Sequence, residues 1–170
     1  MTNEEVKKIA FRVIARVETG FSFIEDNYLI PQRKNSGPDT AWLRSVYILF
    51  SFHFELLLKS ALILFCSFSS KKELERKLLK VGHNLNVIIK ELGDEGAAYI
   101  GIKSVSVANG EYEVIALNGK ILVKDFIDIR YDFIEGRVRD IYSDEDLIIS
   151  QSINLSRDVL NKIKQRYSLL

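Results

Sequence analysis

The side chains that most often carry acid–base, nucleophilic or metal chemistry are few in this chain, which has two histidines and one cysteine. His83 stands in the phrase Gly82-His83-Asn84-Leu85, seven residues after Arg76. A separation of seven on one helix places both side chains on the same side. The functional interpretation is that His83 acts as a general acid or base, or contacts a phosphate, with Arg76 projecting from the same side. The alternative is a histidine that hydrogen-bonds a neighbouring helix and fixes packing.

The other histidine and the cysteine are expected to be structural. His53 lies in a phenylalanine-rich stretch, which predicts a core or interface position, and Cys66 is expected to be a small buried residue. The sequence contains no phosphate-cradling glycine loop, no His-Glu-x-x-His and no Gly-x-Ser-x-Gly. Acidic residues do not occur at a metal-ligand spacing from either histidine, so no metal site and no cofactor is expected.

A narrow polar stripe runs along a segment that is otherwise apolar on nearly all sides. It consists of Arg44, Ser51, Glu55 and Lys59, at steps of seven, four and four. Glu55 and Lys59 have the order that favours an intrahelical ion pair worth about 0.2–0.5 kcal/mol. The alternative is that a polar stripe inside a bundle marks a partner surface or a pocket.

Arg130 and Tyr131 form a third candidate site. One interpretation is that the three acids nearby neutralise the guanidinium, which then fixes the exit of the preceding hairpin to the helices. The other is a cationic and aromatic edge that binds a phosphate or a base, together with Arg137 and Arg139. The acids are Asp125, Asp128 and Asp132.

Four long amphipathic helices and one β-hairpin are predicted to position these residues. The fold class is therefore mainly α, an antiparallel four-helix bundle with the hairpin inserted between the third and last helices at about 102–124. Capping boxes begin the first and third helices, and two Asn-Gly pairs separate short β-branched runs, which predicts a ribbon of two or three strands. The pattern of residues 124–142 fits neither helix nor strand clearly. The predicted helices cover residues 2–28, 41–67, 70–92 and 143 to near the C-terminus.

Composition predicts one cytoplasmic domain spanning 1–170. The net charge of +1 provides no global field for nucleic acid or membranes, so a charged partner would have to meet a local patch. A single cysteine is typical of a reducing compartment, and the acidic N-terminus is unlike a signal peptide. The apolar stretch 46–68 contains His53, Glu55 and Lys59, which indicates a core helix rather than a membrane span.

Several short phrases in this order resemble the HEPN (higher eukaryotes and prokaryotes nucleotide-binding) family of helical bundles. The phrases touch most of the chain from about residue 41 onward. They are Phe54-Glu55-Leu56-Leu57-Leu58-Lys59, Gly82-His83-Asn84-Leu85, and Ile129-Arg130-Tyr131 ahead of a last helix that begins Ser143-Asp144-Glu145-Asp146.

The resemblance implies two classes of function. Many HEPN proteins are metal-independent ribonucleases that use an arginine and a histidine four to six residues later at a composite dimer site, whereas others lack the pair and are binding or scaffold modules. No histidine follows Arg130 here, and the only pair that approaches this spacing is Arg76 with His83, which have six residues between them.

We therefore expect a non-catalytic binding module of a prokaryotic toxin–antitoxin or defence-type system, with a protein, nucleotide or RNA partner. Glu55, Lys59, His83, Arg130 and Tyr131 are its expected contact residues. The alternatives are a ribonuclease toxin using Arg76 and His83, and a purely structural oligomerisation domain. The expected assembly is a homodimer, with a nucleotidyltransferase-like antitoxin as the possible partner.

Overall fold

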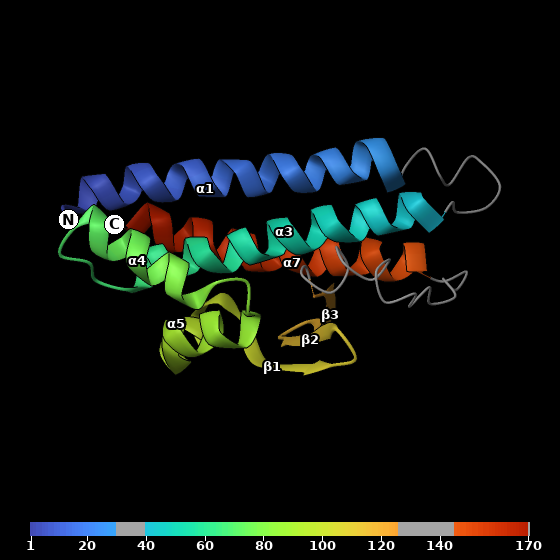
Figure 1. The fold of residues 1–170 in the computed structure, drawn as a ribbon. Coiled ribbons are helices and arrows are strands. Elements are labelled where there is room, and N and C mark those ends of the chain that lie inside the picture. The colour runs from blue at the N-terminus through green and yellow to red at the C-terminus, as the bar shows by residue number, and fades with distance from the viewer. Residues whose placement is uncertain (30–39, 126–144, 170) are drawn as a thin grey trace.

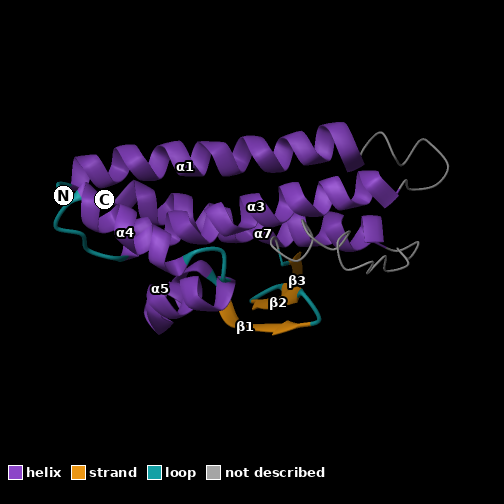
Figure 2. Ribbon diagram, viewed as in Figure 1, coloured by secondary structure: helices purple, strands orange, loops and turns teal. Residues whose placement is uncertain are grey.

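The computed structural model describes residues 1–29, 40–125 and 145–169, and in it the chain is mainly helical with a small antiparallel sheet (Figures 1 and 2). The mainly helical class and the predicted β-ribbon are thereby confirmed. The elements in chain order are α1 (Asn3–Ile24), the π-helical turn η1 (Glu25–Leu29), α3 (Thr40–Phe65), α4 (Lys71–Val81), α5 (Leu85–Ile100), β1 (Ile102–Ala108), β2 (Glu111–Ala116), β3 (Gly119–Lys124) and α7 (Glu145–Leu169).

The three longest helices, α1, α3 and α7, lie side by side and contact one another. Figure 1 shows α1 running opposite to α3, whereas α3 and α7 run in the same direction. The shorter helices α4 and α5 and the sheet lie on one side of these three. α3 is central because it packs against α1, α5, α7 and β3, and its side chains supply much of the core, including Phe50, Phe54, Leu57, Leu58 and Leu62.

The third predicted helix, 70–92, is two helices in the structure, so the expected antiparallel four-helix arrangement is wrong at this point. α4 ends at Val81, and Gly82 follows with φ +57°, ψ −134°, a conformation that a continuing helix excludes. Asn84 then caps α5, its side-chain oxygen accepting a hydrogen bond from the Val87 amide at 3.2 Å. Gly93, the predicted helix end, only interrupts α5, which resumes and continues to Ile100.

The sheet has the order β1-β2-β3, joined by two tight turns. Asn109 and Gly110 form the first turn with φ +54° and +71°, as the Asn-Gly pair predicts. β3 lies against α7, where the Leu122 amide donates to the Ser152 hydroxyl at 3.1 Å. One face of the sheet is buried under the helices, through Tyr112, Val114, Ile121 and Val123.

Among the described residues, one segment is long and apolar enough to cross a membrane, Ser45–Phe65, with a mean hydropathy of 1.8. In the structure 61% of it is buried, against α1, α5, α7 and β3. Burial of this extent is what a core helix shows.

Candidate functional site

Three of the predicted contact residues meet in one cluster. Glu55 on α3 accepts a hydrogen bond from Lys59 Nζ at 2.7 Å and contacts His83 Nδ1 at 2.8 Å. The Glu55 side chain is only 4% exposed, that of Lys59 is 14% exposed, and that of His83 is 49% exposed. The cluster thus runs from a buried carboxylate to a half-exposed imidazole at the surface. We refer to these three residues as the Glu55 cluster.

Local sequence explains how the cluster forms. Glu55 and Lys59 are one helical turn apart on α3, in the order that favours pairing. His83 reaches Glu55 because it is not on a helix: it lies in the connection between Gly82, which ends α4, and Asn84, which caps α5. The break that contradicts the single predicted helix is therefore also what brings His83 to α3.

The contact determines which ring nitrogen of His83 carries the proton. A carboxylate only accepts hydrogen bonds, so His83 carries its proton on Nδ1, and in the neutral ring Nε2 bears the lone pair. A histidine oriented in this way by a carboxylate is held in one rotamer and one tautomer. Its half-exposed ring can stack on a planar group, or it can exchange a proton with a bound ligand.

Arg76 is not positioned as the sequence pattern predicted. Because α4 ends at Val81, the argument that Arg76 and His83 project from the same side of one helix is wrong. Arg76 is exposed, and its Nε donates weakly to the backbone carbonyl of Lys72 at 3.4 Å. It lies instead in the middle of a row of exposed cations on α4.

That row is a feature that the sequence analysis missed. Lys72, Arg76 and Lys80 are all exposed and recur at steps of four, so they share one side of α4. Leu79, beside them, is 80% exposed. We call Lys72, Arg76 and Lys80 the α4 basic row. The helix 71–81 contains five basic and two acidic residues, a local excess that the net charge of the whole chain conceals.

The remaining candidates are not part of the cluster. Arg130 and Tyr131 lie outside the described residues, as does the side chain of Arg44. Ser51 is on the same side of α3, one turn before Glu55, and is 2% exposed. Among the described residues its hydroxyl has no hydrogen-bond partner, so the buried part of the polar stripe contains an unpaired hydrogen-bonding group.

His53 has structural surroundings, as predicted, whereas Cys66, predicted to be buried, is only partly buried. His53 packs between α3 and α1, where its ring lies against Gly20 and its Nδ1 donates to the Leu49 carbonyl at 2.7 Å. Burial lowers the pKa of His53, and nearby Arg16 lowers it further, while the Leu49 carbonyl opposes both. Burial also raises the pKa of the Cys66 thiol, which makes it a poor nucleophile.

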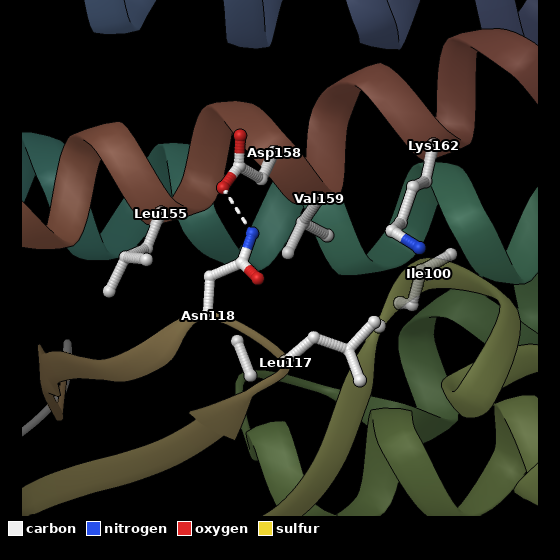
Figure 3. A pocket seen from close by; sticks show the side chains of 9 residues that line it. Ile100, Leu117, Asn118, Leu155, Asp158, Val159 and Lys162 are labelled. Atoms are coloured by element: carbon white, nitrogen blue, oxygen red, sulfur yellow. Dashed lines mark hydrogen bonds between the residues drawn. The ribbon is translucent and has the colours of Figure 1, made fainter.

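Two cavities lie away from the Glu55 cluster, near the β2–β3 turn and the junction of α5 with β1. Figure 3 shows the smaller one, where the β2–β3 turn meets α7 and Asn118 donates to Asp158 at 3.0 Å. Its volume of about 10 Å³ would accommodate one water at most. The larger, about 370 Å³, is lined by Asp94, Ala97, Ala98, Gly101, Ile102, Lys103 and Leu117. Neither is lined by the Glu55 cluster.

Within residues 1–29, 40–125 and 145–169, no group of three or more His, Cys, Asp or Glu side chains could hold a metal ion. Comparisons of the chain with protein-family models, curated proteins and solved structures found no match. The features of the chain that bear on function are therefore the Glu55 cluster, the α4 basic row and the sequence phrases that resemble HEPN proteins.

Proposed function

We propose that the chain is a non-catalytic HEPN-like module that binds RNA at the surface formed by the α4 basic row and His83. The observation that carries the proposal is the His83–Glu55 contact of 2.8 Å, which holds a half-exposed ring at the end of a helix that presents three cations. The surface combines the two features that single-stranded RNA requires, cations for phosphates and a ring on which a base can stack.

The dimensions of the basic row fit an extended strand. From Lys72 to Lys80 the axis of α4 rises by about 12 Å, with a cation at every step of about 6 Å. His83 follows Lys80 by three residues, immediately beyond the helix end. A strand lying along α4 would place its phosphates on the row and one base at the imidazole. An acidic protein could satisfy the cations, but it would make no use of the fixed ring.

The resemblance to HEPN proteins supplies the wider context of the proposal. It favours a cytoplasmic module of a prokaryotic toxin–antitoxin or defence-type system that acts as a homodimer. The possible partner is a nucleotidyltransferase-like antitoxin. In this proposal Arg130 and Tyr131 would add a fourth cation and a second ring to the RNA surface.

Neutralising the basic row tests the proposal. We expect Lys72→Gln/Arg76→Gln/Lys80→Gln to weaken binding of a fluorescent single-stranded RNA about 10- to 100-fold at low salt. The slope of log affinity against log salt should fall by about 2, because each lost phosphate contact removes about 0.7 from the slope for single strands.

The matched control is Lys8→Gln/Arg12→Gln/Arg16→Gln on α1, three exposed cations with the same spacing and charge. The control should bind RNA nearly as well as the wild type. Equal losses in the two triple variants would mean that only net charge matters, and absence of binding by the wild type at low salt would refute the RNA proposal outright.

One observation favours a second function, a metal-independent ribonuclease. A carboxylate that orients a histidine through Nδ1 is an arrangement suited to general acid–base chemistry at Nε2. This alternative predicts that the purified chain cleaves RNA in EDTA, and that His83→Ala abolishes cleavage without unfolding the protein. Arg76→Ala should reduce cleavage only if Arg76 turns toward the substrate.

A further inference from the structure

We propose that β1 is the surface through which two copies of this chain pair, joining their three-stranded sheets into one of six strands. Among the residues that the structure describes, β1 is an edge strand, since it pairs there with β2 alone, and β3 at the other edge lies against α7. Figure 2 shows β1 on the side of the sheet away from the three long helices. The inference depends only on the sheet and is independent of RNA binding at α4.

The hydrogen-bonding groups at this edge can be assigned from the register. The two-residue turn closes on the pair Ala108–Glu111, so Ala108, Ser106 and Ser104 direct their amides and carbonyls toward β2. Those of Val105 and Val107 therefore point outward. Between residues 104 and 108 the described hydrogen bonds are those of the β1–β2 ladder.

The edge lacks the features that usually prevent pairing. Natural edge strands are protected by charges, prolines or short length. β1 has seven residues, no proline, and Lys103 as its one charged residue, next to the bulge between Ile102 and Ser104. The stretch 104–108 carries only Ser, Val and Ala, and all but Val105 are exposed.

The same stretch is complementary to itself. In an antiparallel pair centred on Ser106, Val105 lies opposite Val107 of the second copy, and these two residues are the ones whose backbone groups face outward. Each valine pair would close two hydrogen bonds and bring β-branched side chains together. The valines lie on the face of the sheet that Tyr112 and Val114 bury in the core, where Val107 is 50% exposed.

Charge favours a second copy over an unrelated strand. With Ser106 on the two-fold axis, Ser104 meets Ala108, and Lys103 meets Asn109, so no like charges oppose each other. The turn of the second copy would then lie beside Lys103, which lines the 370 Å³ cavity at the start of β1. The pairing would thus place the β1–β2 turn of the second copy next to this cavity, which is open in the single copy.

A cysteine scan tests the register directly. Opposed residues in a non-hydrogen-bonded antiparallel pair have Cα atoms about 4.5 Å apart, within the range of a disulfide. In a Cys66→Ser background, Ser106→Cys should therefore form an interchain disulfide under mild oxidation. Ser104→Cys is the control, because its equivalent in the second copy would be about 13 Å away.

Charge substitutions test the same contact without oxidation. We expect the wild-type chain to dimerise over about 1 to 500 µM in sedimentation experiments, as suits a small interface. Ser106→Lys should weaken the dimer about tenfold or more, because two lysines then face each other, while in the single chain the new lysine lies opposite Glu113. Thr19→Lys, an exposed position on α1, controls for charge, and mixing Ser106→Lys with Ser106→Glu chains should restore dimers.

Three outcomes would overturn the inference: a wild-type chain that stays monomeric across this range, a dimer that Ser106→Lys leaves intact, or equal cross-linking of the Ser106→Cys and Ser104→Cys variants.

Discussion

Removing the buried carboxylate of the Glu55 cluster perturbs the contact on which the proposed site depends. In Glu55→Met, Lys59 keeps its charge at a position where its side chain is 14% exposed, and His83 loses the acceptor of its Nδ1 proton. Water can replace the lost partner of His83, because that ring is half exposed. It cannot fully replace the partner of Lys59.

The expected loss of folding stability follows from that difference in burial. Breaking a fully buried ion pair by removing one partner costs about 3–5 kcal/mol. Lys59 can relieve part of this cost by moving its ammonium group toward solvent, so we expect Glu55→Met to lower the free energy of unfolding by about 2–3 kcal/mol. Lys59→Met should cost a similar amount, since it leaves a carboxylate that is 4% exposed with His83 as its remaining partner in the cluster.

The double variant Glu55→Met/Lys59→Met distinguishes a buried pair from two independent contacts. Apolar residues of similar volume often replace a buried pair at little cost, so we expect a total loss of only about 0–1 kcal/mol. His83→Ala, which removes the exposed member, should cost less than about 1 kcal/mol. Urea unfolding of the four variants and the wild type at neutral pH measures these differences.

If each single variant lowers the free energy of unfolding by less than about 0.5 kcal/mol, the pair behaves as a solvent-exposed one and the buried-pair explanation is refuted. It is also refuted if the double variant loses the sum of the two single losses, because the residues would then act independently.

Two further predictions concern the contact between α1 and α3. Gly20→Ala should lower the free energy of unfolding by about 1–3 kcal/mol, because the added methyl would lie 2.0 Å from His53 Cδ2. In urea unfolding, the double variant Gly20→Ala/His53→Ala should recover part of the lost free energy. An unchanged free energy of unfolding in Gly20→Ala would contradict the packing of His53 against Gly20. The lowered pKa of His53 means that the unfolded chain takes up a proton below about pH 6.5 while the folded chain resists it, so stability should fall as pH drops through this value and level off below the folded pKa. His53→Gln should flatten that fall between about pH 7.5 and 5 in urea titrations, and an unchanged pH dependence would show that other groups cause it.

The elements with strong local signals were predictable from the sequence. The capping box of Thr2 with Glu5 is present in the structure, and the Asn109-Gly110 turn has the positive φ angles that the residue pair favours. The ion pair of Glu55 with Lys59 also follows from spacing alone, because both partners belong to one helix.

The misassigned helix 70–92 shows where periodicity fails. Its apolar residues keep a helical spacing across Gly82 and Asn84, although the chain turns there. A glycine followed two residues later by a good N-cap residue was the signal of that turn, and the hydrophobic pattern outweighed it. The contact between His83 and Glu55, 28 residues apart, depends on that turn and on the packing of α5 against α3, so spacing could not reveal it.

The most direct test of the proposed function is an NMR titration of the isotope-labelled chain with a short single-stranded RNA in EDTA, followed by analysis of the RNA in the same tube. The account predicts amide shift changes concentrated between Lys72 and Asn84, smaller changes in His83→Ala, and RNA that remains intact. Shift changes that leave this segment unaffected, or RNA that is cleaved by the wild type and spared by His83→Ala, would contradict it.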